Sequence, residues 1–284
     1  IFGQQGIKVL FVDRSSPTPL IMFYVMKHDL SYGMMVTASH NPAIYNGIKV
    51  FTKGGRDADE HQTADIERYL EQADKLYVPD LEENGQMPPH AYQELVKSGQ
   101  VVEMNPMNEY LDNIISLINL DAIRERDLRI AIDPMYGVSL TALCTILSIA
   151  RCTVETINAQ HDTLFGGKMP APTESTLRNL QNYVLDRYCD IGIATDGDAD
   201  RLGVIDDKGH YLHANTILVM LYYYLLKYRG WRGPAVRNLS TTHVLDKVAE
   251  SFGQKCYEVP VGFKYISAKM QETDAIIGGE SSGG

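Results

Sequence analysis

Hydrophobic residues along the chain form short apolar runs that alternate with longer stretches in which apolar residues recur at helical spacing. Short runs rich in Val and Ile are typical of buried strands, whereas apolar residues three and four positions apart indicate helices. The short runs predict strands at residues 7–12, 32–38, 47–51, 128–133, 153–157, 190–195, 234–238, 256–260 and 275–279. The longer stretches predict helices after Pro17–Pro19 and at residues 58–72, 137–150, 174–188, 215–228, 242–251 and 263–270.

Strands that alternate with helices of these lengths predict an α/β fold, built from successive, similar βαβ units with mixed, mostly parallel sheets. Pro, Gly and Asn interrupt the pattern between about Tyr77 and Val102, so this segment is interpreted as a connection between units. We expect the units at residues 1–100, 101–213 and 214–284. Ligands bind beyond the carboxyl ends of strands in such sheets, so polar motifs that follow a predicted strand are candidates for function.

Composition excludes several classes of partner. The formal net charge is −10 and no dense run of Lys and Arg occurs, which argues against nucleic acid. No apolar stretch approaches the roughly 20 residues that cross a bilayer, so no membrane association is expected. Four scattered cysteines without a CxxC pair fit reduced thiols and a cytoplasmic location. The chain opens at Ile1 and stops in a glycine-serine loop, so we expect a fragment of a longer protein.

Three aspartates at alternate positions follow the predicted strand at 190–195, namely Asp196, Asp198 and Asp200. Their carboxylates would repel one another unless a cation lay between them, and such hard oxygen ligands suit Mg²⁺ or Ca²⁺. The small residues Gly197 and Ala199 let the backbone curl and aim the carboxylates at one point. Arg201 adds a fixed cation that can hold a phosphate oxygen. The pattern therefore favours a metal site.

Two other interpretations of the aspartate loop remain. An EF-hand loop also has acidic residues at its first, third and fifth positions, and Asp207 falls at the twelfth. However, Arg201 stands where an EF-hand needs glycine, and strand patterns occupy the flanks where an EF-hand has helices. The second alternative is an acidic turn that binds no metal.

The segment "TASHNP" follows the predicted strand at 32–38 and contains Ser39 and His40. Small polar residues after a strand are more often turn or capping residues than nucleophiles. A hydrolase-type couple of these two residues is not favoured, because neighbouring side chains in an extended chain face opposite sides. The chain also lacks a GxSxG elbow.

Three further segments each have a functional interpretation and a purely structural one. Lys49 lies within reach of the same loop, or is a solvated strand lysine. In "VPVGFK", Gly262 precedes a predicted helix whose free N–H groups favour an anion; Lys264 either adds charge there or is a surface residue. The stretch "GGESSGG" contains carboxylate and hydroxyl groups that suit sugar hydroxyls, or is a plain flexible loop: Glu280, Ser281 and Ser282.

In combination, "TASHNPAIYNGIK", "TDGDADR", "VPVGFK" and "GGESSGG" resemble the α-D-phosphohexomutase family over the whole chain. The last loop resembles the phosphoglucomutase form, including that of bacterial phosphoglucomutase, more than forms that end in histidine. The family has three similar α/β domains and a smaller fourth domain. The resemblance implies that this chain begins inside the first domain, stops inside the third and lacks the fourth, so that alone it would interconvert hexose phosphates poorly.

The resemblance also implies a role for each matched residue. Ser39 would be the phosphorylated serine, and its phosphate would hold one Mg²⁺ together with Asp196, Asp198 and Asp200. Arg201, His40 and Lys49 would lie beside the transferring group, with Lys49 as a candidate general acid/base. The sugar would contact the residues of the last two motifs: Gly262, Phe263, Lys264, Glu280 and Ser282.

The implied function is a phosphoglucomutase-like isomerase that moves phosphate between the 1 and 6 positions of a hexose. Its cofactors would be Mg²⁺ and a hexose 1,6-bisphosphate intermediate, and its partner a small sugar phosphate. Phosphomannomutase and phosphoglucosamine mutase are the alternatives within this class. A non-catalytic sugar-phosphate sensor and a metal-dependent phosphatase are alternatives from other classes. The sequence does not indicate an oligomeric state.

Overall fold

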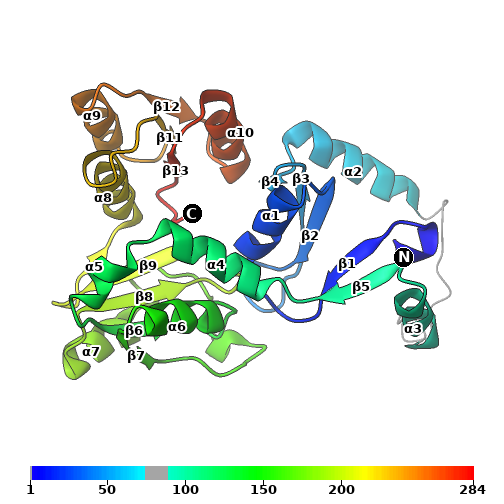
Figure 1. Cartoon of the computed structure of the whole chain (residues 1–284), viewed down its shortest axis with the longest axis horizontal. Helices are drawn as coiled ribbons and strands as arrows, with labels where there is room; N and C mark the ends of the chain where they lie inside the picture. The colour runs from blue at the N-terminus through cyan, green and yellow to red at the C-terminus, as the bar shows by residue number, and fades with distance from the viewer. Residues whose placement is uncertain (1, 74–88) are drawn as a thin grey trace.

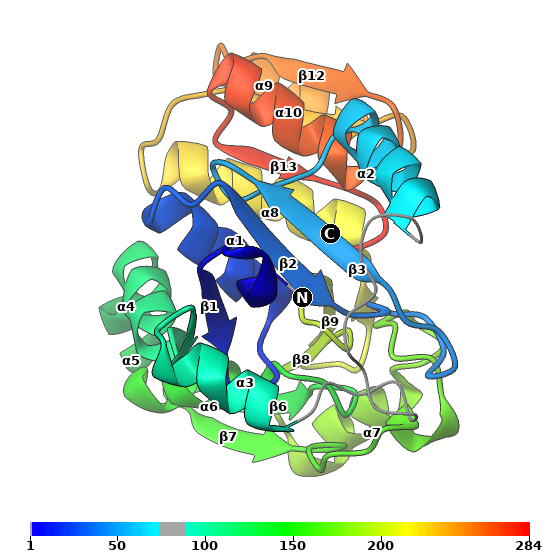
Figure 2. The same ribbon diagram turned by 90° about the vertical axis from the view of Figure 1, so that its right-hand side faces the viewer.

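The computed structural model describes residues 2–73 and 89–284. Three α/β lobes follow one another along the chain: the first lies at the right of Figure 1, the second at the lower left and the third at the upper left. The view from the right-hand side in Figure 2 looks onto the first lobe, with the third lobe above and the second below. The C-terminal loop lies between the lobes (Figure 1), so residues far apart in the sequence converge there.

The first lobe contains two separate sheets. One pairs β1 (Val9–Val12) in parallel with β5 (Val101–Met104), and the other is antiparallel, with β2 (Tyr32–Val36), β3 (Ile48–Thr52) and β4 (Arg56–Asp57). Its helices are α1 (Thr18–Lys27), α2 (Glu60–Ala73) and α3 (Pro89–Lys97), and a short 3-10 helix spans Gly3–Gln5. Because β5 pairs with β1, this strand belongs to a sheet of the first lobe although the predicted boundary lies at residue 100.

The second lobe is built on a five-stranded mixed sheet in the order β10-β9-β8-β6-β7. Its strands are β6 (Arg129–Asp133), β7 (Thr153–Thr156), β8 (Ile191–Thr195), β9 (Leu202–Asp206) and β10 (Tyr211–Leu212). Its helices are α4 (Met107–Leu117), α5 (Leu120–Arg124), α6 (Leu140–Ile149) and α7 (Arg178–Arg187), with a 3-10 turn at Phe165–Gly167. The parallel strand β6 lies between β7 and β8, so the carboxyl ends of β6 and β8 form a topological switch point.

Alternation along β6 explains how helices cover both faces of this sheet. Ala131 belongs to one core cluster with Leu180 and Val184 of α7. Its neighbours Ile130 and Ile132 belong to a second cluster with residues of α6. Because successive strand residues point to opposite faces, the two helices pack on opposite sides and the lobe has three layers.

The third lobe repeats this layered plan with a parallel sheet in the order β12-β11-β13. Its strands are β11 (Ala235–Asn238), β12 (Cys256–Val259) and β13 (Ile277–Gly279), and its helices are α8 (Ala214–Lys227), α9 (Val244–Ser251) and α10 (Phe263–Thr273). Residues of α8 and α9 pack with Ala235 on one face, while Ile266 of α10 packs with Val236 on the other.

The expected α/β fold with mixed sheets is confirmed. The apolar pattern predicts no element at residues 103–127, where the structure has α4 and α5. Apolar residues at helical spacing on and just after α4 pack against α6, a signal that the pattern contained: Leu111, Ile114, Ile115 and Ile118. Part of the predicted connection, residues 74–88, lies outside the described residues. Within residues 2–73 and 89–284, no helix is long and apolar enough to cross a membrane.

Candidate functional site

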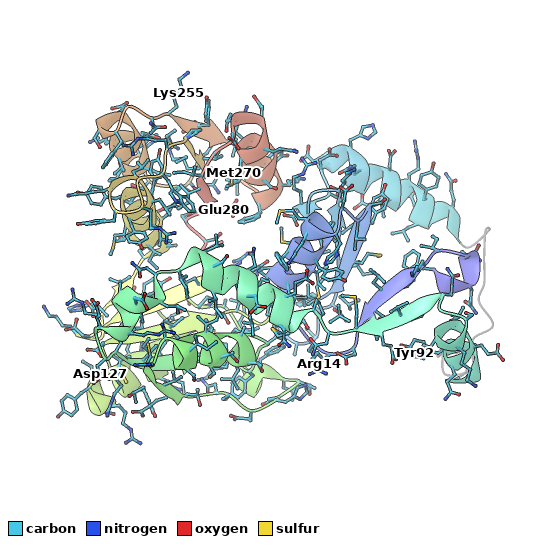
Figure 3. All side chains as sticks on the ribbon, viewed as in Figure 1. Arg14, Tyr92, Asp127, Lys255, Met270 and Glu280 are labelled. Atoms are coloured by element: carbon cyan, nitrogen blue, oxygen red, sulfur yellow. The ribbon has the colours of Figure 1, made fainter. Side chains whose placement is uncertain are left out.

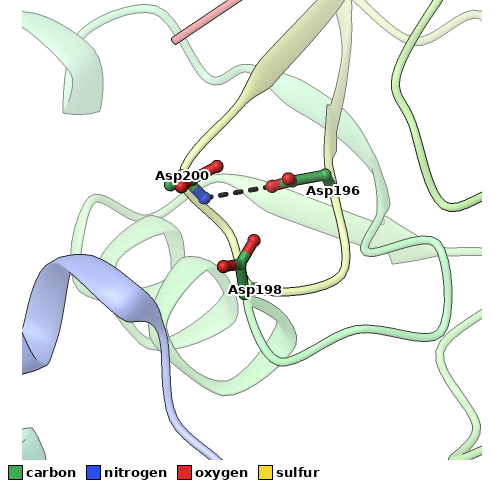
Figure 4. Close-up of side chains that lie close together, drawn as sticks. All are labelled: Asp196, Asp198 and Asp200. Atoms are coloured by element: carbon green, nitrogen blue, oxygen red, sulfur yellow. Dashed lines mark hydrogen bonds between the residues drawn. The ribbon is translucent and has the colours of Figure 1, made fainter. Parts of the chain in front are cut away.

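The aspartate loop joins β8 to the antiparallel strand β9 at the topological switch point of the second lobe. Figure 4 shows the three carboxylates turned toward one space inside the curve of the loop. Each offers an oxygen, and these oxygens all lie within 4.8 Å of one another. Asp196 is 0% and Asp198 3% exposed, whereas Asp200 is partly exposed. Strands rather than helices flank the loop, so the EF-hand interpretation is wrong.

Backbone hydrogen bonds and one close glycine contact fix the shape of this loop. Asp196 Oδ1 accepts from the backbone N–H groups of Asp200 and Arg201, each at 3.0 Å. Ala199 adopts a positive φ of 60°, which turns the chain between the carboxylates. Gly137 packs directly on the loop, since a Cβ there would lie 2.5 Å from the carbonyl oxygen of Gly197. The geometry of the aspartate loop therefore depends on a small residue within the loop, Gly197, and on a small residue packed against it, Gly137.

The electrostatics of the loop fit a divalent cation. Burial, followed by the charges of Asp200 and Asp198, raises the pKa of Asp196 to about 8. Asp198 Oδ1 is buried and has no hydrogen-bond partner among the described residues. A buried, unpartnered carboxylate oxygen beside two further carboxylates suits a bound cation. Oxygen ligands alone favour Mg²⁺ or Ca²⁺ over softer metals, so the donor set fits Mg²⁺.

Ser39 of the first lobe reaches this loop of the second lobe. Its hydroxyl donates to Asp196 Oδ2 over 3.2 Å, and its backbone N–H donates to Thr37 Oγ1 over 2.8 Å. The backbone of Ser39 has a positive φ of 54°, a rare conformation for a residue with a side chain. The Ser39 hydroxyl therefore belongs to the hydrogen-bond network of the aspartate loop.

His40 lies nearer to Ser39 than an extended chain would allow. Its Nδ1 is 3.4 Å from Ser39 Oγ, so the expectation that the two side chains face apart is wrong. The positive φ of Ser39 explains this, because it bends the chain out of the extended conformation. Burial, followed by the charge of Arg201, lowers the pKa of His40, which favours a neutral imidazole.

Lys49 on β3 bridges two of the aspartates. Its Nζ lies 2.8 Å from Asp198 Oδ2 and 2.6 Å from Asp200 Oδ2. Burial opposes the charged ammonium, but the charges and hydrogen bonds of these aspartates outweigh it and raise the pKa of Lys49. The side chain is therefore a cation held against the aspartate loop and not a solvated strand lysine.

Thr18 is a contact that sequence reasoning missed. Its Oγ1 donates to Asp198 Oδ2 and its backbone N–H to the Asp198 carbonyl, both over 2.8 Å. Thr18 is 1% exposed and stands in the first turn of α1, where the sequence indicates only a helix start. The threonine of "SSPTPL" is the signal that the sequence contains for this contact. However, threonine is too common at helix starts to identify Asp198, 180 residues away, as its partner.

The glycine-serine loop of the third lobe meets the chain where the aspartate loop enters β9, through the backbone. Leu202 N–H donates to the Gly283 carbonyl over 3.0 Å. Glu280, labelled in Figure 3, accepts from the Gly262 N–H at Oε1 and from the Ser282 hydroxyl at Oε2, both over 3.0 Å. Gly262 has a positive φ of 135° and caps α10, so the two predicted sugar-binding motifs are in direct contact.

The other two residues of the "VPVGFK" motif lie differently. Phe263 lies against the end of the glycine-serine loop, since a Cβ at Gly284 would be 3.3 Å from its ring. Lys264 turns to the first lobe, where its Nζ lies 3.1 Å from Glu60 Oε1. The structure thus groups Gly262, Phe263, Glu280 and Ser282, but gives Lys264 a carboxylate partner on α2.

Comparisons with known proteins agree with this arrangement. Three domains described as "Phosphoglucomutase/phosphomannomutase, alpha/beta/alpha" match the chain, domain I at residues 1–77, domain II at 108–209 and domain III at 213–284. A "Probable phosphoglucosamine mutase" of Pyrococcus abyssi is 30% identical over 278 residues, which cover 98% of this chain and 57% of that protein. The chain thus spans little more than half the length of the curated relatives it matches.

Solved structures show the same fold. One from Thermus thermophilus, named as a phosphomannomutase, superposes with a TM-score of 0.84 at 28% identity, covering 99% of this chain and 60% of that one. An Aspergillus fumigatus N-acetylphosphoglucosamine mutase in complex with GlcNAc-6P and magnesium has a TM-score of 0.53 at 14% identity, which is a likeness of fold alone, over 94% of this chain and 62% of that one. The matched domains and the fold together show that this chain belongs to the phosphoglucomutase/phosphomannomutase family of α-D-phosphohexomutases.

Proposed function

We propose that this chain carries the phosphoryl-transfer centre of a phosphohexomutase that interconverts hexose 1-phosphate and hexose 6-phosphate. The observation that supports this most strongly is the Ser39 hydroxyl, held 3.2 Å from Asp196 in a three-carboxylate loop that also contacts Lys49. A serine hydroxyl beside a cation site and a partly buried ammonium has the parts that phosphoryl transfer needs. The three units at residues 1–100, 101–213 and 214–284 are the corresponding domains in this proposal, with β5 completing a sheet of the first.

Ser39 would carry the phosphoryl group. In the first half-reaction the Oγ–P bond of phosphoserine breaks while a sugar hydroxyl forms a new O–P bond and loses its proton. The resulting bisphosphate turns around and returns its other phosphoryl group to Ser39. Lys49 is the candidate that stabilises charge on the transferring group and exchanges the proton, with Arg201 and His40 beside it.

Mg²⁺ would be held by Asp196, Asp198, Asp200 and the phosphate on Ser39, and when bound it supplies positive charge to the phosphoryl oxygens. The chain's own residues prepare this site. Thr18 orients Asp198 through two hydrogen bonds, and the loop N–H groups orient Asp196. A preorganised site of this kind needs little rearrangement during transfer.

The third lobe would bind the sugar. The Glu280 carboxylate and the Ser282 hydroxyl stand together on the loop that contacts the aspartate loop, a donor and acceptor set that suits sugar hydroxyls. Gly262 and Phe263 flank this pair, and we assign Lys264 a contact with substrate phosphate once it leaves Glu60. The proposed sugar is glucose, with mannose and glucosamine as alternatives. The names of the relatives, phosphoglucosamine mutase and phosphomannomutase, favour keeping both alternatives.

The test is isomerisation of hexose phosphates followed by ³¹P NMR, with the intact gene product and with this chain. Glucose, mannose and glucosamine 1-phosphates are compared in the presence of Mg²⁺ and a trace of the corresponding bisphosphate. With the intact gene product we expect conversion to the 6-phosphate, fastest for glucose, and none with Ser39→Ala, whereas this chain alone should convert the hexose phosphates poorly. Release of inorganic phosphate in place of an isomer would identify a phosphatase. Binding of the sugar phosphates without any turnover by the intact gene product would identify a sensor.

A further inference from the structure

A buried threonine holds the glycine-serine loop from behind. The backbone N–H of Ser281 donates to Thr241 Oγ1 over 3.2 Å, and Thr241 Oγ1 donates in turn to Asn238 Oδ1 over 2.7 Å. Thr241 is 3% exposed and Asn238 is 1% exposed. Both lie outside the motifs that carry the proposed reaction, so the function proposed above leaves their chemistry unexplained.

The turn that contains Thr241 is itself tied to the sheet. Asn238 is the last residue of β11, in parallel register with Val259 of β12. Its Oδ1 also accepts from the backbone N–H and the hydroxyl of Ser240, over 3.0 Å and 2.9 Å. A continuous set of hydrogen bonds therefore runs from the central strand of the third lobe, through the side chains of Asn238 and Thr241, to the backbone of the loop.

Ser281 faces this turn, while its two neighbours face elsewhere. Its hydroxyl lies 3.2 Å from the hydroxyl of Ser240. Glu280 and Ser282 bond to each other, and Glu280 also receives the N–H of Gly262. Ser281 is therefore anchored to the sheet, whereas the polar groups of Glu280 and Ser282 converge beside the N-terminus of α10.

We propose that Thr241 is a positioning residue that acts through Ser281 to fix the Glu280–Ser282 pair for the sugar hydroxyls. The proposal rests on the proposed function for the sugar and on the hydrogen bonds above for the anchor. Glycines surround the pair in "GGESSGG". Backbone hydrogen bonds within the loop and from Leu202 hold its far end, whereas the Thr241 hydrogen bond ties Ser281 to the sheet of the third lobe. Losing the anchor should free the loop and weaken sugar binding, while the cation site keeps its geometry.

The experiment compares Thr241→Val with Thr241→Ser. Valine keeps the branched shape but removes the hydroxyl, whereas serine keeps the hydroxyl. Amide hydrogen exchange of the 280–284 segment reads the anchor, and calorimetry with glucose 1,6-bisphosphate and with Mg²⁺ reads the two sites separately. Loss of one neutral hydrogen bond predicts exchange about fivefold faster in Thr241→Val. We expect several-fold weaker bisphosphate binding, unchanged Mg²⁺ binding and parent-like behaviour of Thr241→Ser.

Two results would overturn the proposal. One is unchanged exchange of the loop in a folded Thr241→Val chain, and the other is a Thr241→Ser chain that behaves like the valine variant. Circular dichroism and the Mg²⁺ titration establish that each variant is folded. If the parent chain fails to bind the bisphosphate, the proposed function of this chain fails, and the exchange comparison alone decides whether Thr241 anchors the loop.

Discussion

Replacing Asp196 by asparagine should change the stability of the chain in opposite directions with and without Mg²⁺. In the metal-free chain, the carboxylate of Asp196 faces two others whose oxygens lie within 4.8 Å. At an effective dielectric constant of about 20, each such pair of unit charges costs roughly 3–4 kcal/mol. Lys49 offsets the other two carboxylates, but Asp196 has no ion-pair partner within the described part of the chain.

Asparagine fits the same hydrogen bonds and removes the charge. Its Oδ1 still accepts from the N–H groups of Asp200 and Arg201, and its Nδ2 can donate to the Ser39 hydroxyl. Protonation of Asp196 already relieves much of this repulsion at neutral pH, because its pKa is raised to about 8. We therefore expect Asp196→Asn to gain about 1–2 kcal/mol of unfolding free energy in EDTA, well below the full Coulomb cost.

Magnesium should reverse this order. A ligand at a hundred times its Kd stabilises the native state by about 2.7 kcal/mol, and the variant lacks one of the ligands that produce this gain. The assay is thermal and urea unfolding in EDTA and in Mg²⁺. Asp207→Asn is the matched control, since this exposed aspartate lies outside the loop and should leave both values unchanged. A variant that is less stable than the parent in EDTA, or that gains as much from Mg²⁺, would refute the reasoning.

Three further perturbations test separate contacts. Lys49→Met removes the ammonium that neutralises two aspartates, so the free energy of unfolding in EDTA should fall by about 1–2 kcal/mol. Mg²⁺ should stabilise this variant more than the parent in the same unfolding assays, and an equal loss in both media would contradict this. Gly137→Ala places a Cβ 2.5 Å from a loop carbonyl and should cost about 1–3 kcal/mol with weaker Mg²⁺ binding by calorimetry, whereas Gly47→Ala, whose Cβ has an ordinary 3.5 Å contact, serves as control. Arg237 holds the pKa of Asp246 well below its usual range, so the pair stabilises the fold above about pH 4 and loses this contribution as the pH falls further. Asp246→Asn should therefore lower the free energy of unfolding by about 2 kcal/mol at pH 7 and by little in acid, as measured by urea unfolding across pH.

Local patterns predicted the elements whose signals lie within one segment. The strand before the aspartates and the helices of the third lobe follow directly from apolar runs and periodicity. The two-residue strands β4 and β10 are too short to carry any pattern, and they exist because β3 and β9 offer them an edge. α4 is the exception, because its apolar residues have helical spacing and yet no helix is predicted between the connecting segment and β6.

The candidate site shows where sequence reasoning stops. Alternating aspartates among small residues indicate a cation site by themselves, because carboxylates that are close in sequence repel one another whatever the rest of the fold. The contacts of Thr18 and Lys49 with that loop join residues 180 and 149 positions apart, and no local pattern encodes them. The bend that brings His40 to Ser39 depends on the positive φ of Ser39, which the residue types in this segment do not predict.

The central claim is that Ser39 carries a phosphoryl group. It is tested most directly by intact-mass measurement and peptide mapping of the purified chain, before and after incubation with glucose 1,6-bisphosphate and Mg²⁺. The account predicts one phosphoryl group on Ser39 in the parent chain and none in Ser39→Ala. A folded parent chain that never gains this group, or that carries it on a different residue, would contradict the account.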